Sequence, residues 1–176
     1  SAIGDDIFRA LSDLKAEGLV NKIGASCYDF ATLLKNVSTY PIDLLQVPFN
    51  VFDQRLLADD LLTNLNGLDI EVHVRSIFLQ GLLLMEKHKR PAKFNQWQMN
   101  FDRWDEWLIN NNVSALEACL NYPLEFEGIS KVVLGVNDQK QLNEIIMAAT
   151  KNIIHVPSIF SCQDVRLINP VNWSSL

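Results

Sequence analysis

Ile42-Asp43-Leu44-Leu45-Gln46-Val47-Pro48 is a short, mostly apolar run that predicts a buried strand. Similar runs occur before and after it along the chain, at residues 22–28, 70–76 and 131–136. The stretches between these runs contain segments with helical periodicity. An alternation of short apolar strands with helices predicts an α/β fold with a parallel sheet.

The predicted helices rest on apolar residues that recur every three or four positions. In the first helix, Ile7, Leu11 and Leu14 form such a series, and Gly18 is expected to end it. Asp29 is expected to cap the second helix. The helices are predicted over residues 5–17, 29–40, 54–65, 95–110, 113–126 and 138–149. We predict one α/β unit over residues 1–150 and a tail over residues 151–176 that packs on it.

Two architectures agree with four strands. Four β/α units are half of an eight-stranded (β/α)₈ barrel, which typically needs about 250 residues. An open, doubly wound sheet with the same number of strands fits the pattern equally well. Half a barrel would leave two unpaired strand edges and an open core, so it would be expected to associate, most simply as a homodimer.

Composition narrows the classes of partner. The chain of 176 residues is 48% hydrophobic and 20% charged, as in ordinary globular domains. Its net charge is −6, and its lysines and arginines are scattered, so nucleic acid is not expected as a partner. The longest apolar runs fall far short of the roughly 20 residues that a membrane span needs. The N-terminal residues do not form a secretory signal.

Cysteine and histidine spacing does not indicate a metal site. Cys27, Cys119 and Cys162 are widely separated and contain no C-x-x-C pair, which favours a reducing cytoplasm. His73 lies inside a predicted strand, where a structural role is expected. A nucleophilic Cys27 would need a base within reach, and the sequence does not identify one.

Several motifs occur in an order that is similar to the aldo-keto reductases. Residues 14–26 end in Gly24-Ala25-Ser26, which resembles the family's G-x-S strand end. Gln46-Val47-Pro48-Phe49-Asn50 resembles its Q-x-P-[FY]-N signature, and residues 75–83 resemble the end of its seventh strand. Residues 133–136, with Gln141 and Glu144 behind them, resemble its eighth strand and helix.

The resemblance implies the C-terminal half of the barrel, strands 5 to 8. The family's first four strands, which carry a catalytic Asp, Tyr, Lys and His, have no counterpart in this sequence. Hydride transfer to a carbonyl needs the tyrosine as its acid, so this polypeptide alone is expected to show no reductase activity. The implied cofactor is NADP or NAD, bound where barrel enzymes hold their ligands, at the carboxyl ends of the strands.

At the nicotinamide end, the resemblance assigns Ser26 and Gln46 to the carboxamide group. An asparagine usually follows the serine in the family, and Cys27 stands there in this chain. Arg75 occupies the position of an aromatic residue that stacks on the nicotinamide ring. A guanidinium can stack as well, but its charge disfavours the oxidised ring. The alternative roles of Arg75 are a contact to a phosphate and a structural ion pair with a carboxylate.

At the phosphate and adenosine end, the resemblance assigns seven further positions. Ser76, Phe78 and Gly81 would wrap the pyrophosphate through backbone groups. Gly135 and Asn137 would form the phosphate-side loop, and Gln141 and Glu144 would lie on the adenosine side. Gln141 stands where the family often has an arginine for the 2′-phosphate of NADP, so the sequence does not favour NADP.

Two functions remain open at this point. The chain is either part of an NAD(P)-dependent carbonyl reductase or a stand-alone, non-catalytic half-barrel that acts in binding or assembly. An aromatic series at residues 97, 101, 104 and 107 is expected to face the core, with a cover over the cofactor or a subunit contact as the alternative.

Overall fold

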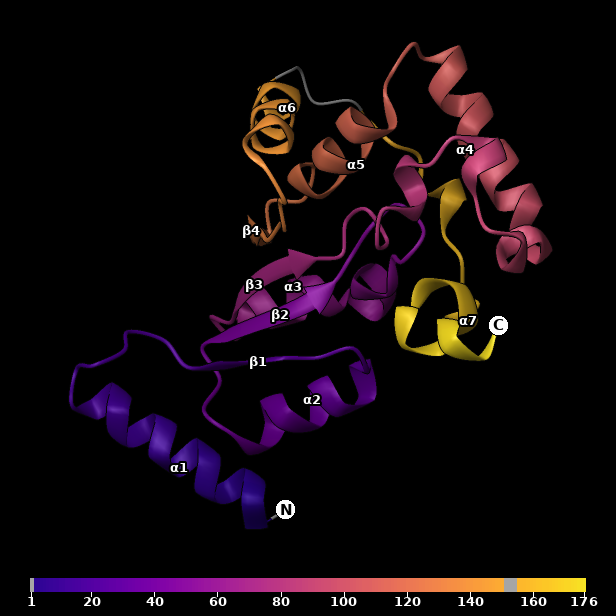
Figure 1. Cartoon of the computed structure of the whole chain (residues 1–176). Coiled ribbons are helices and arrows are strands. Elements are labelled where there is room, and N and C mark those ends of the chain that lie inside the picture. Colours follow the sequence, from indigo (N-terminus) through magenta and orange to yellow (C-terminus); the bar gives the residue numbers. More distant parts are fainter. Residues whose placement is uncertain (1, 151–154) are drawn as a thin grey trace.

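The four strands form a single parallel sheet in the order β1-β2-β3-β4. The computed structural model describes residues 2–150 and 155–176 (Figure 1). The strands are β1 (Gly24–Ser26), β2 (Leu44–Pro48), β3 (Glu71–Arg75) and β4 (Ile129–Val132). The predicted α/β fold with four parallel strands and intervening helices is therefore confirmed.

The helices lie between and after the strands. They are α1 (Ala2–Ala16), α2 (Phe30–Thr39), α3 (Leu61–Gly67), α4 (Gln98–Asn110), α5 (Ala115–Leu124), α6 (Gln139–Ala149) and α7 (Val165–Ile168). Short 3₁₀ segments are η1 (Arg55–Asp60), η2 (Leu82–Leu84), η3 (Lys87–Lys89), η4 (Ala92–Trp97), η5 (Ser158–Phe160) and η6 (Pro170–Ser175). In Figure 1, α1 and α2 lie on the β1 side of the sheet, and α5 and α6 lie near β4.

Local signals set several helix ends. The side chain of Asp29 accepts a hydrogen bond from the N–H of Thr32, so it caps α2 as predicted. Asp138 caps α6 in the same way through the N–H of Gln141. After α1, Gly18 has φ of 75°, the left-handed conformation that glycine adopts without a steric penalty.

The two faces of the sheet differ in polarity. Leu45 and Val47 of β2 and Val72 and Val74 of β3 are fully buried in the hydrophobic core. Successive strand residues point to opposite faces, so Gln46, His73 and Arg75 share the other face. This face carries polar and charged side chains that can contact a ligand. The apolar face packs against the helices.

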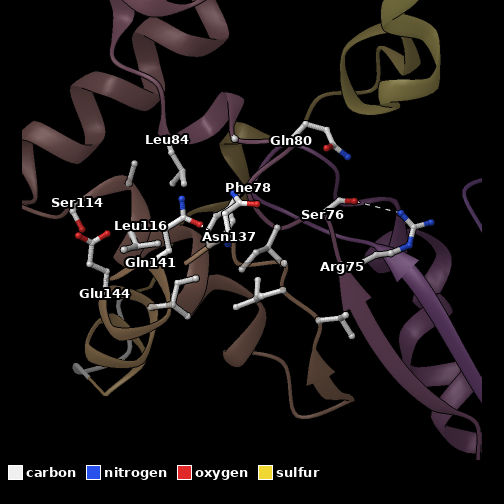
Figure 2. A pocket seen from close by; sticks show the side chains of 17 residues that line it. Arg75, Ser76, Phe78, Gln80, Leu84, Ser114, Leu116, Asn137, Gln141 and Glu144 are labelled. Atoms are coloured by element: carbon white, nitrogen blue, oxygen red, sulfur yellow. Dashed lines mark hydrogen bonds between the residues drawn. The ribbon is translucent and has the colours of Figure 1, made fainter. Parts of the chain in front are cut away.

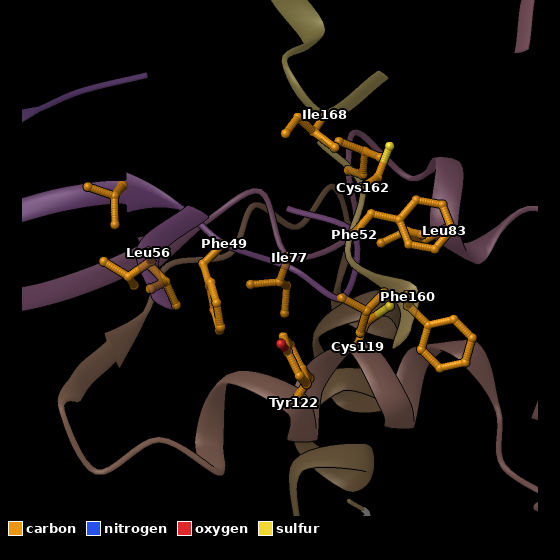
Figure 3. Packing of buried hydrophobic residues seen from close by; sticks show 14 of the residues in the cluster. Phe49, Phe52, Leu56, Ile77, Leu83, Cys119, Tyr122, Phe160, Cys162 and Ile168 are labelled. Carbon is orange, nitrogen blue, oxygen red and sulfur yellow. The ribbon is translucent and has the colours of Figure 1, made fainter. Parts of the chain in front are cut away.

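The hydrophobic core joins the sheet to α5 and to the C-terminal residues (Figure 3). The rings of Phe49, which follows β2, and Tyr122 of α5 stack with centroids 5.1 Å apart. Phe160 and Cys162 are buried in the same cluster, and the N–H of Cys162 donates to the carbonyl of Phe52 at 2.8 Å. Residues 155–176 thus pack on the α/β unit, while the predicted start of the tail, residues 151–154, lies outside the described residues.

The last strand was predicted in the wrong place. The sequence predicts a strand over residues 131–136, whereas β4 spans Ile129–Val132. Its partner β3 ends at Arg75, and Ser76 turns away with φ of 61°, so pairing ends soon after the N–H of Val133 donates to the carbonyl of Val74. The apolar residues beyond this point enter a loop instead.

The predicted helix over residues 54–65 is also wrong, because the chain kinks inside it. Ala58 has extended backbone angles, and Asp59 and Asp60 are left-handed, so the chain kinks within η1 before α3 begins at Leu61. In one straight helix, Leu56 and Leu65 would lie about 180° apart around the axis. Both are buried in the same core, and the kink makes this possible.

The aromatic series of η4 and α4 faces the core, as predicted. Trp97, Phe101 and Trp104 are buried, and Trp107 packs against them half-buried. The predicted single helix over residues 95–110 is split into η4 and α4.

Within the described residues, no helix is long and apolar enough to cross a membrane.

Candidate functional site

A pocket of about 890 Å³ lies at the carboxyl ends of β3 and β4 (Figure 2). Its volume falls within the usual range for small-molecule sites. The segments after β3 and β4 form much of its wall, together with the first residues of α5 and the first turns of α6. The lining residues are Arg75, Ser76, Ile77, Phe78, Gln80, Gly81, Leu84, Ser114, Ala115, Leu116, Val133, Leu134, Gly135, Asn137, Gln141, Glu144 and Ile145.

The loop after β3 holds an unusual backbone conformation. Ser76, Leu79 and Gln80 have φ values of 61°, 47° and 54°, and Gly81 follows at 82°. Non-glycine residues rarely adopt positive φ, and such conformations persist only where the surroundings enforce them. Leu79 is fully buried, and Asn50 donates to the carbonyl of Ser76 at 3.1 Å. These anchors fix a rigid loop along the pocket wall.

Eight of the ten residues that the sequence assigns to a cofactor site line this pocket. They are Arg75, Ser76, Phe78, Gly81, Gly135, Asn137, Gln141 and Glu144. They come from segments up to 69 residues apart, from Arg75 to Glu144, and the parallel order of β3 and β4 brings those segments together.

Ser26 and Gln46 lie next to the pocket rather than in its wall. Their strands pair in register, and the hydroxyl of Ser26 donates to Gln46 Oε1 at 3.1 Å. Arg75 connects this pair to the pocket, because its Nε donates to Ser26 Oγ at 3.3 Å. The ten residues therefore form one continuous surface at the carboxyl ends of the strands.

The guanidinium of Arg75 is held entirely by neutral groups. It lies over the ring of Tyr28 at 3.8 Å, and it donates to Ser26 Oγ, to Ser76 Oγ at 3.3 Å and to the carbonyl of Cys27 at 3.4 Å. The sequence leaves open whether Arg75 contacts a ligand or forms a structural ion pair. Among the described residues, no carboxylate pairs with Arg75, so the predicted ion pair is wrong.

Comparison with known proteins decides the family. Residues 4–155 match the Aldo/keto reductase family. The chain belongs to this family. A D-threo-aldose 1-dehydrogenase from Pseudomonas sp is 26% identical over 148 residues, which are 78% of this chain and 44% of that protein.

Solved structures of aldo-keto reductases share the fold. The holo form of aldo-keto reductase AKR11C1 from Bacillus halodurans has a TM-score of 0.68 at 17% identity, over 86% of this chain and 52% of that one. Its apo form gives the same TM-score over 88% and 54%. The chain thus spans about half the length of the aldo-keto reductases that it matches.

The starts of both helices at the pocket already have acceptors for their N–H groups. At α5, Ser114 Oγ accepts from the N–H of Glu117, and the Glu117 carboxylate accepts from the N–H of Ser114 at 3.0 Å, which is a capping box. At α6, Asp138 accepts from Gln141, and Gln141 Oε1 accepts from the N–H of Asn137 at 3.0 Å. An anion at either helix start would face a carboxylate in the cap.

Sequence reasoning missed the α5 wall of the pocket. Ser114, Ala115 and Leu116 line it, although no motif of the aldo-keto reductases pointed to them. The Ser-x-x-Glu spacing of Ser114 and Glu117 marks a helix start, but it does not show that this start lies beside β3 and β4. The remaining unassigned lining residues are Ile77, Gln80, Leu84, Val133, Leu134 and Ile145.

A second polar cluster lies on the same sheet face, centred on Glu71 at the start of β3. Its carboxylate pairs with Lys22 and lies 2.6 Å from His73 Nε2 and 3.8 Å from Lys131 Nζ. His73 is thus structural, as expected. The hydrogen bond from Lys22, followed by the one with His73, lowers the pKa of Glu71 from 4.5 to about 2.

This low pKa predicts a pH-dependent contribution of Glu71 to stability. A carboxyl whose pKa is lower in the folded state stabilises the fold above its unfolded-state pKa, near 4.5. We expect E71Q to lower the free energy of unfolding most near neutral pH, and this difference to shrink as the pH falls below 4.5 toward 2. Urea unfolding at several pH values measures it, with E127Q, at an exposed carboxylate, as the control. A difference that does not change with pH would contradict the prediction.

Proposed function

We propose that this chain is the cofactor-binding, C-terminal half of an NAD(P)-dependent aldo-keto reductase that reduces carbonyl groups. The observation that carries the proposal is the single surface that joins the pocket-lining residues to Ser26 and Gln46 through Arg75. The site offers backbone groups of a rigid loop, neutral amides and hydroxyls, and apolar side chains. This mixture suits a ligand with phosphate, ribose and aromatic parts.

The dinucleotide would lie with its two ends at opposite sides of the site. Ser26, Gln46 and Arg75 would hold the nicotinamide end, and Ser76 to Gly81 would border the pyrophosphate. Gln141 and Glu144 on α6 would then face the adenosine end. The residues of this chain bind and orient the cofactor, whose chemistry is the transfer of hydride to a carbonyl carbon.

Catalysis is proposed to need a second set of residues. In this family the proton donor is a tyrosine assisted by an aspartate, a lysine and a histidine, and the resemblance places them on the first four strands of the barrel. Four parallel strands and a span of about half the length of the relatives support the assignment of this chain to the other half. We therefore expect cofactor binding without turnover.

The electrostatics of the pocket support NAD over NADP. Among the described residues that line it, Arg75 is the one lysine or arginine, and it belongs to the nicotinamide end. On the adenosine side, Glu144 is a carboxylate, and Lys140 is 3.8 Å from it. A 2′-phosphate there would meet Glu144 and the capping carboxylate of Asp138, whereas a 2′-hydroxyl can donate to a carboxylate.

Titration calorimetry with NADH and NADPH tests this proposal. We expect NADH to bind, and NADPH to bind about tenfold more weakly, a difference of about 1.4 kcal/mol. Q141R places a cation on the adenosine side and should strengthen NADPH binding. N143R, on an exposed position of α6 outside the pocket wall, is the matched control. If neither dinucleotide binds, the proposed function fails.

A second candidate function follows from the open sheet. β1 and β4 end the described sheet, and each leaves one strand edge unpaired. Two copies related by a twofold axis could cover these edges, which would make the chain a non-catalytic assembly module. Light scattering of the purified chain and the intact mass of the natural gene product distinguish the reductase function from the assembly function. A product near 20.0 kDa that is dimeric favours assembly, whereas a mass near twice 20.0 kDa favours the enzyme.

A further inference from the structure

Arg75 carries a positive charge that no described residue neutralises. Other arginines of the chain hold a carboxylate: Arg55 pairs with Asp53, Arg90 with Asp105 and Arg166 with Asp164. Arg75 instead donates to two hydroxyls and one carbonyl, and its guanidinium covers the ring of Tyr28. A half-buried charge without a counter-charge acts on any ligand group that binds beside it.

Two hydrogen bonds connect this charge to the side chains that are proposed to hold the carboxamide. Arg75 Nε lies 3.3 Å from Ser26 Oγ, and Ser26 Oγ lies 3.1 Å from Gln46 Oε1. A carboxamide bound by Ser26 and Gln46 would place its ring near the guanidinium of Arg75. The oxidised nicotinamide ring has a charge of +1, whereas the reduced ring is neutral. The two forms of the cofactor therefore differ most where Arg75 lies.

We infer that the positive charge of Arg75 makes this site bind the reduced dinucleotide in preference to the oxidised one. The inference rests on the proposed function, because it needs the nicotinamide end of the cofactor beside Ser26 and Gln46. Two unit charges about 6 Å apart repel each other by an amount that corresponds to roughly threefold in affinity in water and roughly hundredfold at an effective dielectric constant of about 20. We expect about tenfold for this half-buried group.

The neighbours of Arg75 keep this effect in place. Tyr28 supports one face of the guanidinium, and the contacts with Ser26, Ser76 and the Cys27 carbonyl orient its edge. Among the described residues of the pocket wall, the carboxylate is that of Glu144, which belongs to α6 and pairs with Lys140. It does not form an ion pair with Arg75.

The test compares the dissociation constants of NADH and NAD⁺ for the whole chain and three variants. We expect NAD⁺ to bind about tenfold more weakly than NADH. R75K keeps the charge and should largely keep this ratio, whereas R75Q should lower it to about threefold or less. R9Q removes an arginine of α1 that is 72% exposed and lies outside the pocket wall, so it should leave the ratio unchanged. Raising the salt concentration should also reduce the ratio.

The possible failures are distinguishable. If both forms bind and R75Q has the same ratio as the parent chain, the role of Arg75 is overturned while the proposed function stands. If R75K loses the preference as fully as R75Q, the preference depends on the guanidinium shape rather than on charge, and the inference is again overturned. If neither NADH nor NAD⁺ binds, the proposed function fails, and this inference fails with it.

Discussion

Replacing Gly24 with alanine is expected to lower the free energy of unfolding by about 2–3 kcal/mol. A Cβ at this position would lie 2.0 Å from the carbonyl oxygen of Leu44 and 2.8 Å from its carbonyl carbon. Both are backbone atoms of the neighbouring strand, so they cannot move without separating β1 from β2. Gly24 pairs with Leu44 in the same register that places Ser26 beside Gln46. We therefore expect G24A to weaken dinucleotide binding as well.

The matched control is Gly67, at the end of α3. A Cβ there meets no atom within 4 Å, and alanine suits a helix better than glycine does. G67A should be neutral or slightly stabilising. Urea unfolding of both variants measures the difference, and equal stabilities of the two would contradict the account of the β1–β2 contact.

Replacing Trp104 with alanine is expected to have the largest effect, a loss of about 3–5 kcal/mol. The side chain is fully buried, with Trp107 stacked at 5.7 Å between centroids and Phe160 edge-on at 5.4 Å. Its removal leaves a large cavity at the point where the C-terminal residues join α4. Its Nε1 also donates to the carbonyl of Leu83 at 3.2 Å, and this bond is lost too.

The consequences of W104A should reach the pocket. Leu83 belongs to η2, and its neighbour Leu84 lines the pocket wall. We expect a lower denaturation midpoint and weaker NADH binding in W104A. W104F should fall between the parent chain and W104A, because it fills part of the volume. I109A, on the same helix at a side chain that is 77% exposed, should change stability by less than about 0.5 kcal/mol. A W104A variant as stable as I109A would contradict the prediction.

Position on a strand explains why part of the candidate site could be predicted. Ser26 and Gln46 lie at strand positions that the apolar runs identify, and neighbouring parallel strands bring their carboxyl ends together. Gly81 could be assigned to a turn because glycine adopts positive φ without a penalty, and its φ is 82°. The motif order added the loop after β3 and the start of α6. In each case the signal is local, or it follows from the general geometry of a parallel sheet.

The environment of Arg75 could not be predicted. The sequence left an ion pair and a ligand contact open, because charge alone does not show which partner is near. Tyr28, Ser26 and the carbonyl of Cys27 lie about 50 positions before Arg75 in the sequence, and only the β1-β2-β3 order brings them to its guanidinium. The α5 wall of the pocket could not be predicted for the same reason. Ser114 lies beside β3 and β4 because of tertiary packing, which its spacing in the sequence does not indicate.

The amino-acid sequence by itself determined the alternation of strands and helices, the cap at Asp29 and the periodic apolar residues of the helices. These features depend on side-chain periodicity and on hydrogen bonds between residues a few positions apart. The tertiary structure alone decided where β4 ends, where the chain kinks within η1, and which residues share the pocket. Those outcomes depend on whether a partner strand continues and on which faces must be buried together. Such conditions arise from contacts between distant segments, which a local pattern does not contain.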